Sequence, residues 1–425
     1  MSAEPMSASY PDRTVERLDL RRWIREGDRV MWSQGNAEPL TLLEQLIDQR
    51  RAFGQIDVFL ALSFSNTMRQ EYCDVFHYEG LGGLGANSRL SRQGVLEVHP
   101  MQLGQFCNDL HDGRFPVDVA FVQLAGPDRD GNYSAGFDHT YTRDLVSRAR
   151  VVIAEVNTNA PVLPGASTIR PDELDAVVHT DRPVCPAPVA VSDEVDRKIA
   201  AHVAELVPDR ATLEVGIGAL PSCVLEALAG HRDLGIHTGM ITRPMLSLIG
   251  SGAVTNAFKP VDTGYSTGSI LAFDQPQRLD PYPLRLRPSR ETLHFTALAG
   301  QPSMVAINTA VEIDLSGQVN AEYVPEGYVG AVGGLLDFVR GARASDGGRS
   351  IFAIHSRTSR GRSRIVSALA GGVVTVPRSD ANWVVTEWGA VDLAHASLSE
   401  RARRLISIAH PDDREALSKA WHDRN

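Results

Sequence analysis

The sequence predicts an α/β protein built from two open sheets, and two observations carry this prediction. Short apolar runs rich in β-branched residues alternate with amphipathic helical patterns along most of the 425 residues, as in parallel sheets covered by helices. A proline-rich stretch without a clear period, residues 179–192, interrupts this alternation near the middle of the chain. We therefore expect two α/β domains, residues 1–185 and residues 186–425.

The first half contains four apolar strand patterns, at residues 29–33, 56–62, 116–124 and 151–156. The last three are almost continuously apolar, which is typical of parallel strands that are covered on both faces. Between the first two strands, leucine and isoleucine recur at helical spacing in residues 40–47 and predict a helix that covers the sheet.

The second half begins with Ser192, a residue type that caps helix N-termini. Apolar residues at helical spacing follow it in residues 195–206 and predict a helix. A further βαβ unit, described next, and a series of strands and helices complete this half. We expect strands at residues 304–315, 351–355, 373–376 and 383–385, and helices at residues 399–408 and 412–421.

The βαβ unit occupies residues 212–240. A short β-branched run leads to Gly216 and Gly218, and Pro221 then suits the first turn of a helix. A second strand is predicted at residues 234–240, parallel to the first. A glycine turn before a helix N-terminus favours anions, such as a phosphate or a thioester carbonyl oxygen. Pro221 stands where the dinucleotide fingerprint requires a third glycine, so a nicotinamide site is not expected.

Composition excludes several classes of protein. The chain is 43% hydrophobic and 22% charged, the balance of an ordinary globular enzyme. Its net charge of −10 argues against a nucleic-acid binder, which needs a basic patch. No apolar run approaches the length of a membrane span, and residues 1–15 lack the apolar core of a secretory signal. We expect a cytoplasmic protein with no nucleic-acid or membrane partner.

No metal site is expected either. The four cysteines lie far apart and form no Cys-x-x-Cys pair, so they indicate free thiols in a reducing compartment. Asp128 and Asp130 are metal ligands by type, but residues 128–132 are equally well explained as a solvated turn.

Several motifs resemble those of one family in the same order along the chain. The chain is similar to the acetyl-CoA hydrolase/transferase family, the single-chain CoA-transferases that include 4-hydroxybutyrate CoA-transferase-like enzymes. This resemblance implies two open α/β domains of CoA-transferase type, with acyl-CoA bound in the cleft between them. We also expect a homo-oligomer. The motifs are residues 153–157 with Pro161 and Gly165, 214–221, 234–240, 307–310, 314–320, 333–338, 363–366, 385–389 and 408–411.

Three positions depart from the family pattern. In the family a glutamate in a His-Thr/Ser-Glu-Met motif attacks the thioester and forms a glutamyl-CoA intermediate. Here that motif contains Gly239, which has no side chain to carry an intermediate. The family's glutamine before Gly-Ile-Gly is Glu214, and the glutamine of its Gly-Gly-Gln motif is Leu335.

The candidate catalytic residues are Glu214 and His237. Glu214 lies near the end of the first strand of the βαβ unit, and parallel neighbours lie about 4.8 Å apart, so its carboxylate is expected to approach the space at Gly239. It would serve as a nucleophile or a general base, or as a structural hydrogen-bond partner. His237 is a candidate base or oxyanion partner, or a buried structural histidine. The residues expected to bind CoA are Gly216, Ile217, Gly218, Gly333 and Gly334.

Three functions remain open from the sequence. The first is an acyl-CoA enzyme without a glutamyl-CoA intermediate, which hydrolyses the thioester, cleaves a carbon–carbon bond or transfers the acyl group directly to a second substrate. The second is a CoA-transferase that moves CoA between carboxylic acids with Glu214 as substitute nucleophile. The third is a non-catalytic CoA-binding paralogue. The expected partners are acyl-CoA and a small carboxylate, another nucleophile or water.

Overall fold

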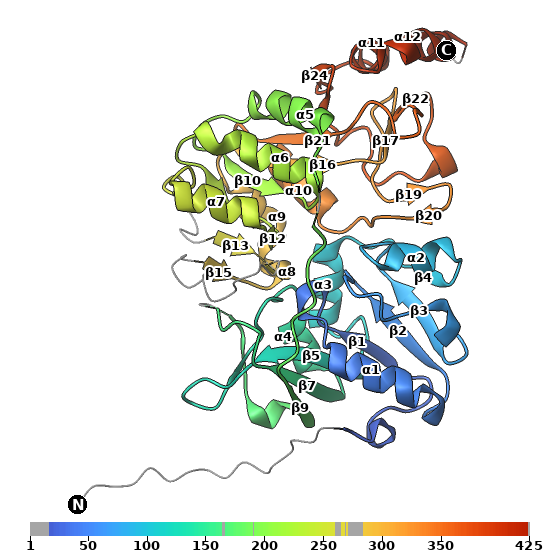
Figure 1. Cartoon of the computed structure of the whole chain (residues 1–425). Helices are drawn as coiled ribbons and strands as arrows, with labels where there is room; N and C mark the ends of the chain where they lie inside the picture. The colour runs from blue at the N-terminus through green and yellow to red at the C-terminus, as the bar shows by residue number, and fades with distance from the viewer. Residues whose placement is uncertain are drawn as a thin grey trace, which may run out of the picture.

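Two stacked α/β units form the molecule, with the N-terminal half below the C-terminal half in Figure 1. The computed structural model describes residues 17–163, 166–189, 191–259, 265–267, 269–270 and 284–423. The polar segment 1–15 and Gly165 therefore lie outside the described residues. Within these ranges, no helix combines the length and the apolar composition that a membrane span requires.

The N-terminal sheet has nine described strands, most of them parallel. The helix α1 (Leu40–Gln49) covers one face, while α3 (Leu103–His111) and α4 (Thr142–Arg148) cover the other. The short helix α2 (Asn87–Arg92) lies beside the sheet edge. In spatial order the main strands are β4 (Leu96–Val98), β3 (Phe76–Gly80), β2 (Ile56–Leu60), β1 (Arg29–Trp32), β5 (Val119–Ala125), β7 (Val151–Asn157) and β9 (Ala176–Thr180), with β6 (Tyr133–Ser134) and β8 (Thr168–Ile169) attached beyond β5.

The C-terminal sheet has six described strands, of which only the last is antiparallel to its neighbour. The helices α5 (Glu194–Ala204), α6 (Ala219–Ala227) and α7 (Arg243–Ser251) pack on one face, and α9 (Phe295–Ala299) and α10 (Leu335–Ala344) pack on the other. The strand order is β11 (Gly235–Ile236), β10 (Thr212–Val215), β16 (Met304–Thr309), β21 (Arg349–Ala353), β23 (Trp383–Thr386) and β24 (Gly389–Asp392).

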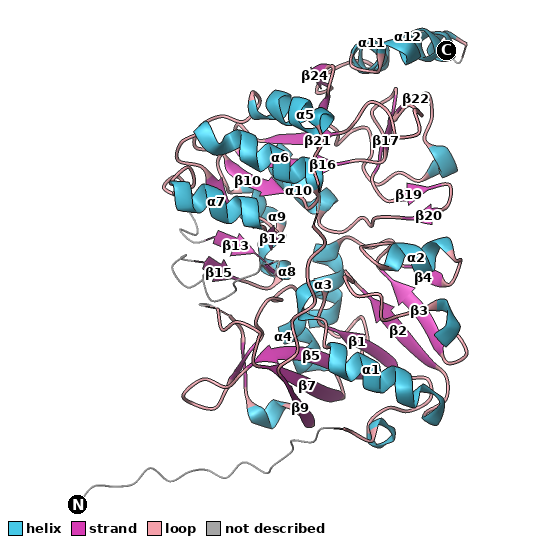
Figure 2. Ribbon diagram, viewed as in Figure 1, coloured by secondary structure: helices cyan, strands magenta, loops and turns pink. Residues whose placement is uncertain are grey.

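Smaller elements surround this second sheet (Figure 2). Two helices, α11 (Leu398–Ser407) and α12 (Pro411–His422), end the described chain, and α8 (Ser289–Thr292) precedes α9. The short sheets pair β12 (Met240–Ile241) with β14 (Ser269–Ile270), β13 (Tyr265–Thr267) with β15 (Leu284–Leu286), β17 (Glu312–Asp314) with β18 (Val319–Asn320) and β22 (Ile365–Val366), and β19 (Tyr323–Val324) with β20 (Gly327–Tyr328).

Glycines allow the two halves to meet backbone to backbone. The amide of Gly83 donates to the carbonyl of Gly330 at 2.8 Å. A Cβ atom at Gly83 would lie 2.0 Å from the Tyr328 carbonyl oxygen, and one at Gly82 would lie 2.3 Å from that of Gly330. Any larger residue at either position would therefore push the halves apart. A second contact joins the amide of Leu103 to the carbonyl of Gly333 at 2.8 Å.

The sequence predicted most elements, and the parallel pairing of β10 with β11 is confirmed. Two strand predictions were wrong in extent. Residues 304–315 form two strands in different sheets, β16 and β17, because the chain leaves the main sheet after Thr309. Residues 234–240 likewise divide into β11 and β12, since only Gly235 and Ile236 pair with β10.

Two local predictions were also wrong. Residues 373–376 do not form a strand, because only Val376 makes a bridge, to Val319. The N-cap of α5 is Asp193 instead of Ser192: the Asp193 carboxylate accepts a hydrogen bond from the amide of Asp196. The two main sheets lie on either side of residues 181–193, whereas the boundary at residue 185 stays a prediction.

Candidate active site

The candidate residues gather where the strands of the C-terminal sheet end. Thr212 pairs with Gly235 and Leu213 with Ile236, so Glu214 and His237 are the next pair in register. The amide of His237 still donates to the carbonyl of Leu213, at 2.9 Å. Because Leu213 packs among α5, α6 and α7, the alternation of a strand points Glu214 to the opposite face, where α9 and α10 pack.

Glu214 is a buried carboxyl group with one side-chain partner. Its exposed fraction is 5%, and its Oε2 accepts a hydrogen bond from Nδ2 of Asn308 at 2.9 Å. Burial disfavours the charged form and raises the pKa of Glu214 to about 8, with the Asn308 hydrogen bond opposing the shift. At neutral pH this group is therefore mostly a neutral acid.

His237 is also buried. Its Nε2 donates to the carbonyl of Thr292, on α8, at 2.8 Å. This bond fixes the ring against α8 and engages Nε2 with the scaffold.

Gly239 leaves space beside the ring of Phe338. Among the described residues, a Cβ atom at Gly239 would meet only Cε2 of Phe338, at the ordinary contact distance of 3.8 Å. The carbonyl of Gly239 accepts from the amide of Ser269 at 3.1 Å. The position therefore has room for a larger side chain but supplies no carboxylate.

The loop with Gly216, Ile217 and Gly218 is open. Gly216 has no atom closer than 3.9 Å to its Cβ position, and Ile217 is 40% exposed. Gly218 adopts φ +128°, which suits glycine. It is the N-cap of α6, and no side chain caps that terminus. The first amides of α6 are thus oriented toward the open side, as an anion or carbonyl oxygen requires.

The second glycine pair begins α10. Gly333 adopts φ +51° and has open space at its Cβ position, whereas a Cβ at Gly334 would lie 3.4 Å from the Phe338 ring. No side chain caps the N-terminus of α10 either. The Phe338 ring thus lies beside both Gly334 and Gly239. Asn308 lies beside both Glu214 and Gly216: its Nδ2 donates to Glu214, and its Oδ1 lies 4.0 Å from the Cβ position of Gly216. No described contact joins the two glycine loops directly.

Three residues of the C-terminal half with buried hydroxyl groups were missed by sequence reasoning. Among the described residues, Thr238, Thr242 and Ser289 have hydroxyl oxygens that are buried without a hydrogen-bond partner. The amide of Ser289 donates to the carbonyl of Thr140, in the N-terminal half, at 3.0 Å, so Ser289 lies at the junction of the two halves. Serine and threonine are too common in sequences for these positions to be singled out. Only the structure shows that their hydroxyl groups are buried without a partner, which is unusual for buried polar groups.

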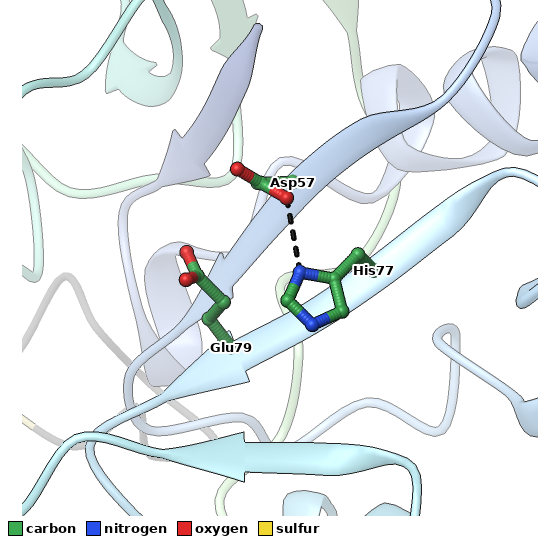
Figure 3. Close-up of side chains that lie close together, drawn as sticks. All are labelled: Asp57, His77 and Glu79. Carbon is green, nitrogen blue, oxygen red and sulfur yellow. Dashed lines mark hydrogen bonds and ion pairs between the residues drawn. The ribbon is translucent and has the colours of Figure 1, made fainter. Parts of the chain in front are cut away.

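A cluster of possible metal ligands lies elsewhere, on the N-terminal sheet (Figure 3). Nδ1 of His77 lies 3.0 Å from a carboxylate oxygen of Asp57. Glu79 accepts from Nε of Arg29 at 2.9 Å. These carboxylates already have cationic or imidazole partners, so the cluster is best described as an ion-pair network. A second group, Asp193, Asp196 and His355, surrounds the N-terminus of α5.

Comparison with known proteins identifies the family. The sequence profile of the acetyl-CoA hydrolase/transferase N-terminal domain matches residues 3–188, and that of the C-terminal domain matches residues 282–421. The 4-hydroxybutyrate coenzyme A transferase of Clostridium kluyveri is 31% identical over 98% of this chain and 98% of its own length. The chain belongs to the acetyl-CoA hydrolase/transferase family.

Two further relatives support the assignment. The crystal structure of RipA from Yersinia pestis superposes with a TM-score of 0.91 at 31% identity, covering 97% of each chain. An acetyl-CoA hydrolase of Eremothecium gossypii is 27% identical over 76% of this chain and 69% of its own length. The predicted family and the α/β fold of CoA-transferase type are confirmed, and the protein is an enzyme of the CoA-transferase and acyl-CoA hydrolase type.

Proposed function

We propose that this enzyme acts on acyl-CoA thioesters without forming a glutamyl-CoA intermediate at position 239. The observation that carries the proposal is Gly239 itself: the position borders the Phe338 ring and open space, and no carboxylate occupies it. The reaction is then thioester hydrolysis, carbon–carbon cleavage or direct acyl transfer, with water or a second substrate as acceptor.

The two glycine loops would bind the CoA thioester. Gly216, Ile217 and Gly218 offer open space and the uncapped N-terminus of α6, and Gly333 and Gly334 precede the uncapped N-terminus of α10. Backbone amides at such termini favour phosphate groups and the oxygen of a polarised thioester carbonyl. The absence of Cβ atoms lets a substrate approach the backbone closely.

Glu214 would act as the acid–base group. A pKa of about 8 lies close to neutral pH, where general acid–base catalysis is most effective. At pH 7 only about one-tenth of such a group is ionised, which makes it a weak nucleophile. His237, next to Glu214 in register, would assist as a base or oxyanion partner.

A second candidate function is CoA transfer with Glu214 as nucleophile. Its support is the burial of Glu214 beside Asn308, because a dry site slows hydrolysis of a covalent thioester. The two functions differ in a measurable way: the second one requires a covalent adduct on Glu214.

The test is incubation with a panel of acyl-CoAs, with mass spectrometry of products and of the intact protein. We expect turnover without a covalent adduct. Glu214→Gln should lower turnover by roughly 10²–10⁴-fold, while Glu226→Gln, at an exposed carboxylate on α6, should leave it unchanged. Undiminished turnover in Glu214→Gln would remove Glu214 from the mechanism. CoA binding without turnover of any substrate would instead support a non-catalytic paralogue.

Gly239→Glu asks whether the family chemistry can be restored. The open position beside Phe338 should accept the side chain, and Glu214→Gln in the same protein avoids two neighbouring carboxylates that raise each other's pKa. A borohydride-sensitive thioester adduct on residue 239 would show that the scaffold still presents the thioester to that position.

A further inference from the structure

A cavity of about 540 Å³ lies between the two halves, away from the glycine loop of α6. Its volume is within the usual range of small-molecule sites. The N-terminal half contributes four residues ahead of and within the first turn of α3, and the C-terminal half contributes the rest. The lining residues are Pro100, Met101, Gln102, Gln105, Glu322, Tyr328, Val332, Leu336, Val373, Val374 and Thr375.

Glu322 is the charged residue of this lining, and it is only 3% exposed. Its Oε1 accepts a hydrogen bond from the Thr375 hydroxyl at 2.9 Å. Its Oε2 is buried and, among the described residues, has no hydrogen-bond partner. The Glu322 carbonyl accepts from the amides of Val329 and Gly330, at 2.8 and 3.1 Å, so the backbone holds this side chain in a fixed place.

The remaining walls suit a short aliphatic body. Val332, Leu336, Val373 and Val374 are apolar, and Val374 is 41% exposed, which is a large exposure for an aliphatic side chain. The Tyr328 ring, which packs edge-on against Tyr323 at 5.3 Å, adds an aromatic surface. No lining residue carries a positive charge.

We infer that this cavity is a second ligand site, for a small organic ammonium ion with a short aliphatic chain. The ammonium group would pair with the carboxylate of Glu322, which lines the cavity, and gain from the aromatic surface of Tyr328. The aliphatic chain would lie on the valine and leucine side chains. An uncharged alcohol would fit the same cavity but would supply no charge to compensate the buried carboxylate.

The site is separate from the proposed reaction centre. On α10, Leu336 lines the cavity, whereas the Phe338 ring borders Gly239. Residues two positions apart on a helix face different sides. The backbone bridge between Gln102 and Gly333 lies between the cavity and the space at Gly239.

Proton linkage gives a specific readout. Burial raises the pKa of Glu322, against the Thr375 hydrogen bond, and Tyr328 is the other titratable side chain in the lining. An ammonium ion lowers the pKa of a carboxyl group beside it. Binding of the ammonium ion should therefore tighten as pH rises through the pKa of Glu322, which calorimetric titrations over a range of pH detect.

The experiment is calorimetric titration of the full chain with n-butylammonium and, in parallel, 1-butanol. We expect n-butylammonium to bind, more tightly as pH rises, and 1-butanol to bind at least tenfold more weakly. Glu322→Gln should weaken n-butylammonium binding by about 10- to 100-fold. Glu326→Gln, at an exposed carboxylate between β19 and β20, should leave it unchanged.

Val374→Arg tests the site independently. The position is partly exposed, so the fold should survive, and the new guanidinium would occupy the cavity beside Glu322 and block the ligand. No binding of n-butylammonium to the unmodified protein would overturn the inference. Equal binding by Glu322→Gln and Val374→Arg, or equal affinity for 1-butanol, would also overturn it.

Discussion

Glu38 and Glu214 are buried carboxyl groups, one in each half of the molecule, and they are held very differently. Glu38, in the loop after β1, accepts hydrogen bonds from the amides of Phe64 and Ser65, at 2.5 and 3.0 Å. It also accepts from the hydroxyls of Ser63 and Ser65, at 2.9 and 2.5 Å. Among the residues that the structure describes, Glu214 accepts from Asn308 alone. Burial raises the pKa of both groups.

This difference fits a structural role for Glu38 and the acid–base role that we propose for Glu214. Four nitrogen and oxygen donors hold the Glu38 carboxylate, and the Cys185 thiol is a fifth donor at 3.9 Å. Among the described residues, Glu214 has a single side-chain partner, and its pKa of about 8 lies near neutral pH. Two acids of similar burial are therefore held differently because their numbers of donors differ.

The largest expected effect is on stability at Glu38. Glu38→Leu leaves four buried donors without an acceptor and should lower the free energy of unfolding by about 3–5 kcal/mol. Glu214→Leu removes a poorly satisfied buried carboxyl and should cost less than about 1.5 kcal/mol. Urea denaturation at pH 7 measures both, and equal losses would contradict the comparison.

The pH dependence of stability should reveal Glu214. Its pKa in the folded protein, about 8, lies above the ordinary 4.5, so the folded state holds the proton more tightly. The contribution of Glu214 to stability is then greatest at low pH and is lost as pH rises from about 5 to 8, by at most about 1.4 kcal/mol per pH unit. Glu214→Gln should show a correspondingly flatter decline. Parallel curves for the two proteins would mean that Glu214 titrates normally.

Glu155 extends the comparison to a third buried acid. Glu155 lies on β7, and its carboxylate accepts from the amides of Thr41 and Leu42, at 2.7 and 3.1 Å. It thereby caps the N-terminus of α1. Glu155→Ala should cost about 1–2 kcal/mol of unfolding free energy. The matched variant Glu44→Ala removes an exposed carboxylate of α1 that pairs with Arg182, and it should change the free energy of unfolding by less than about 1 kcal/mol. A loss in Glu44→Ala as large as in Glu155→Ala would argue against the cap.

The smallest effect is expected at an exposed acid. Asp193→Ala removes the side-chain cap of α5 and should cost about 1 kcal/mol. Ser192→Ala should cost less than about 0.5 kcal/mol, because Ser192 is not the cap. Thermal unfolding of the two variants ranks them, and the reverse order would restore the sequence-based assignment.

Much of the fold could be predicted because its signals are local. Apolar runs located β1, β2, β5 and β7, and the glycine turn located the start of α6. Errors arose where long-range pairing decides the outcome. An apolar stretch has the same sequence pattern whether it forms one strand or two strands of different sheets. β16 and β17 are such a case, since they belong to different sheets. The cap of α5 was misplaced by one residue, since Ser192 and Asp193 are both good capping types.

The site was less predictable for the same reason. The sequence identified Glu214 and His237 as candidates on two parallel strands. It placed Glu214 beside Gly239, whereas the register of the strands puts His237 next to Glu214. The partners Asn308, Thr292 and Phe338 come from distant segments, and no spacing rule connects them. The catalytic roles, the metal-free chemistry, the homo-oligomer and the cytoplasmic location stay predictions.

The backbone pairs between the two halves have a consequence for measurement. The amides of Gly83 and Leu103 donate to the carbonyls of Gly330 and Gly333, across the junction and on both sides of Ala331 and Val332. Their exchange with deuterium therefore reports separation of the halves directly, at a loop that adjoins both proposed ligand sites. A ligand that holds the halves together would slow exchange at these two amides together, and no probe would have to be attached to the protein.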